Sequence, residues 1–235
     1  MDRCREPAYD VRPGPDTAHH QRFGQRHTEC LGWIRAANTT VTLNATDMGS
    51  GVASITYRVG AGAPATISAA TTSFAVTAQG TTTISYFAKD KSGNVETTKT
   101  VTVKLDNVGP AVATTFPAEG VSYNSGSWQN KCLSTTGAAA TGMCGTSSDA
   151  TSGISSVKYQ LRRTLLTTVQ CWTGSTWAAC TDAYVATASG PTTQPGSWLI
   201  PLTYTQRGNN TYTFALTISA TDVASNTTSS VRNFR

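Results

Sequence analysis

Residues 212–220 read Tyr-Thr-Phe-Ala-Leu-Thr-Ile-Ser-Ala. In this stretch the apolar residues Tyr, Phe, Leu, Ile and Ala alternate with Thr, Ala, Thr and Ser, and this alternation predicts the fold class. A period of two places alternate side chains on opposite faces of a β-strand, one toward a core and one toward water. The chain is therefore predicted to consist of half-buried antiparallel strands. The same alternation recurs in five other stretches: 41–45, 55–59, 84–88, 101–105 and 157–161.

The composition favours the same fold class. Charged residues make up only 13% of the 235 residues, whereas threonine alone makes up roughly 18%. Threonine is stiff at its branched Cβ and favours strands, while exposed helices are built from Ala, Leu, Glu and Lys. An all-helical fold is thus nearly excluded. The chain has no run of 18 apolar residues, so no membrane-spanning helix is expected.

The alternation stops in two places, which define the domains. Asp-Asn-Val-Gly-Pro at 106–110 interrupts it, because glycine and proline break regular structure, and we predict one domain over 33–107 and another over 108–235. Residues 1–32 contain all three histidines and little alternation, and they are expected to be a disordered tail. The start has no apolar signal-peptide region, which indicates a fragment of a longer chain or a misassigned start.

The second domain repeats short motifs of the first in the same order. Residues 45–52, Ala-Thr-Asp-Met-Gly-Ser-Gly-Val, align with residues 147–154, Ser-Ser-Asp-Ala-Thr-Ser-Gly-Ile. Residues 88–94, Ala-Lys-Asp-Lys-Ser-Gly-Asn, align with residues 220–226, Ala-Thr-Asp-Val-Ala-Ser-Asn. The aspartates of the two motifs are 43 residues apart in the first copy and 73 in the second, so the second copy carries 30 more residues, most of them between 162 and 198.

These motifs together resemble the bacterial Ig-like and fibronectin type III-like repeats of secreted and cell-surface proteins. The resemblance covers about residues 33–235. It implies an all-β chain of two tandem Ig-like β-sandwich domains, each with seven strands in two antiparallel sheets. It also implies use as a spacer, adhesion or accessory module.

The second copy resembles the longer, disulfide-bearing variety of these repeats. Trp128, Cys132, Cys144 and Asp149 follow one another in the order seen in that variety. The copy departs from the pattern at Ser225, where the first copy has a glycine, so its final hairpin turn is expected to differ.

The six cysteines fall into three pairs that are close in the sequence. Six cysteines allow fifteen pairings, and spacing favours the local ones: Cys132 with Cys144, Cys171 with Cys180, and Cys4 with Cys30. Disulfides of this kind place a protein in an oxidising compartment, so we expect an extracellular or cell-surface location. No pair has the C-x-x-C spacing of redox or zinc-ribbon motifs.

The residues offer little for catalysis, and no catalytic site is predicted. All histidines lie in the tail, which leaves no Ser-His-Asp or Cys-His arrangement in the domains. The four repeated aspartates are interpreted as caps of their own turns. The tail holds zinc-ligand types in a spacing that matches no familiar structural site: Cys4, His19, His20, His27 and Cys30.

Calcium is the one cofactor that the sequence leaves open. In a sandwich, Asp149 and Asp222 would lie at the pole that meets the incoming chain, near the linker residues Asp106 and Asn107. Three carboxylates, an amide and backbone carbonyls supply the six to eight oxygen ligands that calcium takes.

Tryptophan provides the main candidate for ligand binding. In Cys171–Cys180, a Gly-Ser turn sets Trp172 across from Trp177 on one face of a hairpin. In that register Cys171 faces Ala178, so the disulfide needs a bulge or a longer loop. The two rings, with Trp198, are candidates for stacking on a sugar or a protein partner, and the alternative is that they cover the hairpin's own small core.

The net charge of +5 does not by itself predict an anionic partner. The first thirty residues cancel, with five arginines against five acids, and the remaining charges are spread thinly along the chain. Nucleic-acid binders cluster their positive charge, so no nucleic-acid partner is expected.

These observations predict a non-enzymatic structural or adhesion spacer, part of a larger secreted or surface protein. Its partners would be the flanking domains of that protein, with a glycan or surface protein as a further partner. The alternative function is a carbohydrate-binding accessory module of a secreted hydrolase. The residues do not identify the ligand, the parent protein or the oligomeric state.

Overall fold

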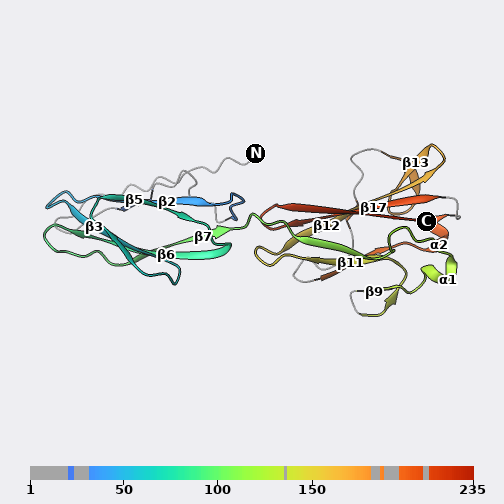
Figure 1. Cartoon of the computed structure of the whole chain (residues 1–235), viewed down its shortest axis with the longest axis horizontal. Coiled ribbons are helices and arrows are strands. Elements are labelled where there is room, and N and C mark those ends of the chain that lie inside the picture. Colours follow the sequence, from blue (N-terminus) through green and yellow to red (C-terminus); the bar gives the residue numbers. More distant parts are fainter. Residues whose placement is uncertain (1–20, 24–31, 135–136, 181–185, 188–195, 209–211) are drawn as a thin grey trace. The chain divides into compact units, whose positions relative to one another are not determined.

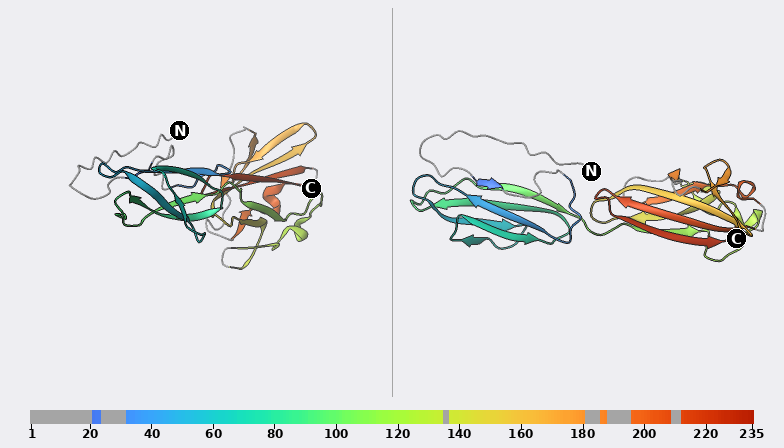
Figure 2. Two further views of the ribbon diagram at one scale, coloured as in Figure 1. Left: turned by 60° about the vertical axis from the view of Figure 1, so that its left-hand side comes forward. Right: turned by 90° about the horizontal axis from the view of Figure 1, so that it is seen from above.

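The chain is described by a computed structural model over residues 21–23, 32–134, 137–180, 186–187, 196–208 and 212–235. It divides into two compact units, residues 1–107 and residues 108–235. Figures 1 and 2 show that both are built from strands, with only two single-turn helices in the described part. None of the helices in the described part is long and apolar enough to cross a membrane.

The first unit is a sandwich of two antiparallel sheets, a three-stranded and a four-stranded one in its described residues. Its core is filled from both sheets by side chains such as Val41, Leu43, Ile55 and Ile84. Each is bracketed by more exposed neighbours, as the period of two predicts. The three-stranded sheet has the order β1 (Gln21–Phe23), β2 (Thr39–Ala45), β5 (Thr71–Val76), and the four-stranded sheet has the order β4 (Ala65–Ile67), β3 (Val52–Val59), β6 (Gly80–Asp90), β7 (Lys99–Leu105).

The second unit has the same plan with a larger second sheet. Its three-stranded sheet has the order β16 (Gly196–Pro201), β11 (Gly142–Ser148), β8 (Ala111–Phe116). Two short strands, β9 (Cys132–Leu133) and β10 (Ala139–Ala140), pair separately. The larger sheet has the order β14 (Trp177–Ala179), β13 (Thr168–Trp172), β12 (Ile154–Leu165), β17 (Thr213–Asp222), β18 (Thr227–Phe234), and β15 (Ala186–Thr187) pairs with β12.

The alternation in residues 212–220 is observed in β17, which lies in the middle of the larger sheet. Phe214, Leu216 and Ile218 are buried in the core, while the residues between them are half-buried on the other face. Burying each such side chain contributes about 1.5–3 kcal/mol to folding. The strand begins one residue later than the pattern, at Thr213.

The additional residues of the second copy form the hairpin β13–β14, the short strand β15 and part of the connection to β16. Two one-turn helices, α1 (Ser125–Trp128) and α2 (Tyr204–Arg207), belong to the same unit. Each begins with a capping box, in which Asn124 or Thr203 exchanges hydrogen bonds with the third helical residue.

Two disulfides staple the second unit. Cys132 is bonded to Cys144, which ties the β9 segment to β11, and Cys171 is bonded to Cys180 in the β13–β14 hairpin. Cys171 lies opposite Ala178 in the ladder, and Cys180 directly follows β14, so the chain reaches the bond just beyond the end of the strand.

Most of the predicted disordered tail lies outside the described residues, together with Cys4, Cys30 and the three histidines. Within it, Gln21–Phe23 form β1, which pairs antiparallel with β2. This strand was not predicted, because three residues are too few to show a period of two.

Candidate functional site

In the first unit, the two turns that recur in both copies of the repeat are stabilised by aspartate side chains. Asp47 Oδ2 accepts a hydrogen bond of 2.7 Å from the backbone N–H of Gly51. Asp90 accepts one of 2.7 Å at Oδ1 from the backbone N–H of Asn94 and one of 2.6 Å at Oδ2 from its side-chain amide. A backbone bond from Lys91 N to Gly51 O joins the two turns.

The second unit repeats this arrangement. Asp149 Oδ1 accepts the backbone N–H groups of residues 151–153 at 2.8–3.0 Å. Asp222 accepts the backbone and side-chain N–H groups of Asn226 at 2.7 and 2.9 Å. The bond from Val223 N to Gly153 O joins these two turns. The aspartates therefore cap their turns in both units, as interpreted from the sequence.

The hydrogen bonds have an electrostatic consequence at Asp90. The side-chain amide of Asn94, and then the backbone N–H groups of the turn, hold the pKa of Asp90 below its ordinary value. A lowered carboxylate pKa stabilises the fold above the unfolded-state pKa, and this stabilisation is lost as the pH falls through the folded-state pKa. The turn is thus firm at neutral pH and loosens in acid.

The final hairpin turn does not differ between the copies, which corrects the expectation at Ser225. Ser225 adopts φ of 69°, the left-handed region that Gly93 occupies with φ of 97°. Both turns are closed by the same backbone pair, from Ser225 N to Asp222 O and from Gly93 N to Asp90 O. This conformation is sterically strained for serine, because its Cβ atom approaches the carbonyl oxygen. Glycine has no Cβ atom and is not strained.

The three carboxylates of the predicted calcium site are all buried. Asp149 and Asp222 are buried neighbours, with carboxylate oxygens within 4.8 Å of each other. Asp106 follows β7 directly and is fully buried. Asn107 Oδ1 accepts a 2.7 Å bond from the side-chain amide of Gln79, so this oxygen is engaged within the first unit. Calcium binding remains a prediction.

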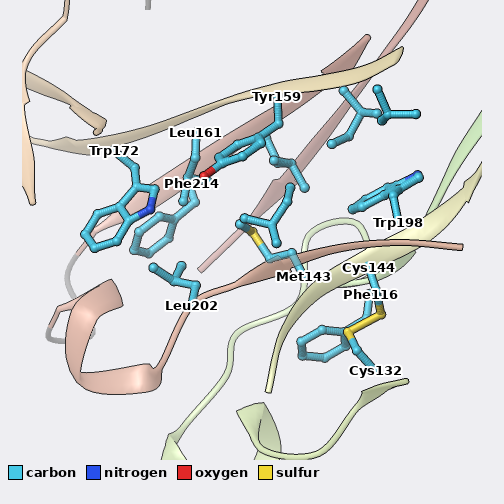
Figure 3. Close-up of a cluster of buried hydrophobic side chains, with 14 of the residues drawn as sticks. Phe116, Cys132, Met143, Cys144, Tyr159, Leu161, Trp172, Trp198, Leu202 and Phe214 are labelled. Atoms are coloured by element: carbon cyan, nitrogen blue, oxygen red, sulfur yellow. A yellow bond between two sulfur atoms is a disulfide. The ribbon is translucent and has the colours of Figure 1, made fainter. Parts of the chain in front are cut away.

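The tryptophan hairpin has the predicted register, but its rings are not all accessible. Trp172 lies opposite Trp177, with ring centroids 5.4 Å apart. Trp172 and Trp198 are each 1% exposed and point into the core of the second unit (Figure 3). Neither ring can stack on a ligand at the surface, because both are buried in the core of the second unit. The predicted ligand contact is therefore wrong for these two tryptophans, and the alternative that they belong to a core holds.

Trp198 is buried because β11 provides a place for its ring. It pairs with Gly145, where a Cβ atom would overlap both the indole ring and the carbonyl oxygen of Ala113. The indole N–H donates to Thr146 O at 3.2 Å. Gly145, which follows Cys144, thus leaves room for the ring of a core tryptophan.

Trp177 remains partly exposed, and a hydrogen bond and a cation–π contact hold its ring in place. Its indole N–H donates to Gln206 O at 2.6 Å, which attaches the hairpin to α2. The guanidinium carbon of Arg163 lies 4.3 Å from the centroids of both Trp177 and Tyr212, so the cation is stacked between two aromatic rings. Burial lowers the pKa of Arg163 from its ordinary value, which is far above neutrality.

Sequence reasoning missed a second arginine among aromatic rings. Arg207, the last residue of α2, is fully buried, and its guanidinium lies 4.7–5.3 Å from the rings of Trp128, Tyr204 and Phe214. Its Nη2 donates to Tyr123 O at 2.8 Å. Nothing in the sequence around Arg207 distinguishes it from an exposed arginine, because the partners Tyr123 and Trp128 come from a segment far away in the chain.

Comparisons with known proteins give only remote similarity. No family model matches the chain, and no curated protein matches it. The solved structures it is similar to include the fibronectin(III)-like modules of Clostridium thermocellum CbhA, with 17% identity, a TM-score of 0.29, and 37% of this chain and 98% of that one covered. The D00-D0 domain of intimin has 10% identity, a TM-score of 0.40, and 92% and 100% coverage.

Carbohydrate-binding modules from the β-sandwich superfamily are also similar, with 11% identity, a TM-score of 0.30, and 93% and 97% coverage. All three are similar to this chain at low identity. The two-sheet β-sandwich of each unit is defined by its own sheet orders and by the core that each pair of sheets encloses.

Exchange of the two turn residues tests the strain at Ser225. We expect Ser225→Gly to stabilise the second unit by about 0.5–1 kcal/mol, because relief of left-handed strain exceeds the added chain entropy of glycine. Gly93→Ser should destabilise the first unit by a similar amount. Urea unfolding of both variants measures the change, and a lower midpoint for Ser225→Gly would contradict the assignment of strain.

Calorimetric titration of the full chain with calcium tests the predicted site. Binding should release or absorb heat at or below millimolar calcium, and it should be lost in a variant with Asp106→Asn, which does not remove a turn-capping aspartate. Magnesium serves as the control ion, since it needs stricter octahedral geometry. Absence of heat at millimolar calcium would end the prediction.

Proposed function

We propose that this chain is a non-catalytic extracellular spacer and adhesion segment of a larger secreted or surface protein. The observation that carries the proposal is the path of the chain through the second unit. β8 begins at Ala111, opposite Ser148 and next to the Asp149 turn. β18 ends at Phe234, opposite Phe214, at the end of β17 away from Asp222. The chain thus enters at one pole of the unit and leaves at the other.

This path suits a module that transmits force from one neighbour to the next. Tension on the two ends pulls β8 along β11 and β18 along β17, parallel to the strands and perpendicular to their hydrogen bonds. Many hydrogen bonds then share the load. The β18–β17 ladder alone runs over eight residue pairs, from Phe234 opposite Phe214 to Thr227 opposite Thr221.

The polar groups of the two units also support a structural role. The repeated aspartates cap their turns, and Glu96 forms an ion pair with Lys99. Glu119 accepts a hydrogen bond from the backbone N–H of Asn233, and its Oε2 lies 3.9 Å from Nη1 of Arg232. Two disulfides support an oxidising, extracellular environment. The partners in this proposal are the flanking domains of the parent protein.

A carbohydrate-binding accessory module is the alternative function, and one observation favours it. Of the three tryptophans considered from the sequence, Trp177 alone keeps part of its ring at the surface. Arg163 and the bond to Gln206 fix the orientation of this ring, and a fixed aromatic ring is suited to stacking on a sugar.

Single-molecule stretching between the two chain ends tests the spacer function. We expect discrete unfolding events for the two units, because each has its own core. Reduction of the two disulfides should lengthen the unfolded chain by about 60 Å, since sequence separations of 12 and 9 residues, at about 3.5 Å per residue, replace Cα–Cα distances of 5.8 and 4.9 Å. Continuous extension at low force, without discrete events, would contradict the proposal.

A glycan array separates the alternative from the spacer function. If Trp177 stacks on sugar, Trp177→Ala should abolish a neutral-glycan signal and Trp177→Phe should keep part of it. Near-ultraviolet circular dichroism of both variants provides the control that the second unit remains folded. An array that shows no neutral-glycan signal for the unmodified chain would leave the accessory function without support.

A further inference from the structure

The acidic side chains in the described part of the first unit are all withdrawn from the outer faces of its sheets. Asp47 and Asp90 cap turns at the end of the sandwich, and Asp106 is fully buried. Glu96 is ion-paired with Lys99, next to the core residue Tyr86 in the ladder. The negative charge of this unit is therefore either buried, paired or placed in turns.

Three cations lie on the outer face of the four-stranded sheet. Arg58 on β3, Lys89 on β6 and Lys104 on β7 each alternate with residues that face or border the core. They share this face with hydroxyl side chains and one half-buried aromatic ring. We name this surface the basic hydroxyl face; it consists of Ser54, Thr56, Arg58, Thr66, Thr81, Thr83, Ser85, Phe87, Lys89, Thr100, Thr102 and Lys104.

The strand register spaces these cations evenly. Arg58 lies opposite Ser85 of β6, and Lys89 is four residues further along that strand, about 13 Å away. Lys104 lies opposite Thr81, which is four residues from Ser85 in the other direction. The cations thus spread over about 26 Å along the strand direction on three neighbouring strands, with hydroxyl groups between them. Arg58 Nη2 donates to Ala61 O, which uses one of the five guanidinium N–H groups.

The opposite face of the same unit shows that this charge is not a general property of the surface. The outer face of β2 and β5 carries Thr40, Thr42, Asn44, Thr71 and Ser73, none of which is charged. Several of these groups bond to one another, with Thr42 to Ser73 at 2.8 Å and Thr71 to Asn44 at 2.9 Å. On their outer faces, β2 and β5 thus carry no charged residue, whereas β3, β6 and β7 carry three cations.

We propose that the basic hydroxyl face binds an extended acidic polysaccharide whose carboxylates are spaced along the chain. Each cation pairs with a sugar carboxylate, the threonine and serine side chains between them bond sugar hydroxyls, and Phe87 packs against the C–H face of a ring. Arg58 lies about 14 Å from Lys89 and about 16 Å from Lys104, so each cation reaches a different sugar residue of an extended polymer. Three cations are few for nucleic acid, because its affinity depends on the number of phosphates that are neutralised.

This inference concerns a binding activity that the spacer function does not require, so either can fail alone. The probe is polygalacturonate, and the same polymer with its carboxylates methyl-esterified is the control ligand. The full chain should bind the acid form, with an affinity that falls as salt rises, and should not bind the esterified form.

The matched protein variants remove three positive charges each. The variant R58Q/K89Q/K104Q empties the face, and K91Q/K131Q/R235Q removes the same charge from exposed residues elsewhere. We expect the first variant to raise the Kd about tenfold or more and the second to change it less than about twofold. Circular dichroism and the urea midpoint confirm that both variants are folded.

Three outcomes would overturn the proposal. They are no binding of polygalacturonate by the full chain, an equal loss of affinity in the two triple variants, and equal binding of the esterified polymer. Competition by single-stranded DNA at a lower concentration than polygalacturonate would assign the face to nucleic acid and would likewise overturn it.

Discussion

Each unit depends on hiding one face of two sheets from water at the same time. Neither sheet can bury its apolar residues alone, so the side chains from facing strands fill one shared layer. In the second unit this layer includes Leu161, Leu216 and Ile218, all fully buried, and each contributes about 1.5–3 kcal/mol. The turns, disulfides and capping residues fix how the strands reach this layer.

This constraint also sorts the polar groups by position. A strand has only an inward and an outward face, so a charged residue in a strand is turned outward unless the sheet edge or a turn accommodates it. Aspartate serves in the turns, because its carboxylate accepts backbone N–H groups there. Arg58, Lys89 and Lys104 stay on an outer face, where three neighbouring antiparallel strands bring them together. Cations that are scattered along the sequence thereby form one positively charged surface.

The larger second unit shows how an insertion is stabilised. The β13–β14 hairpin extends beyond the original sandwich, and the Cys171–Cys180 disulfide closes it. Trp172 points inward into the shared core, while Trp177 and Arg163 connect the hairpin to α2. Arg207 in α2 is in turn enclosed by aromatic rings. The inserted segment is therefore part of the packing of the unit and does not hang freely from it.

Local signals in the sequence predicted the strands, the two-sheet class and the aspartate turns well, because these features depend on neighbours within a few residues. The same signals did not predict the left-handed conformation of Ser225, because serine seldom adopts it, and they did not predict the short strand β1. They also left open whether Trp172 and Trp198 contact a ligand or belong to a core. The depth of these rings depends on which segments cover them, and for Trp198 one of these is the Gly145 region, which is distant in the chain.

By itself, the sequence determined that alternate residues point to opposite sides and that cysteines close in the chain can pair. Both follow from the short reach of a residue along its own backbone. Only the tertiary structure decided which tryptophan keeps an exposed ring, which arginine is enclosed by aromatic groups, and that three scattered cations lie on one face. Those outcomes depend on the register of strands brought together from distant parts of the chain, and packing of the whole unit selects that register.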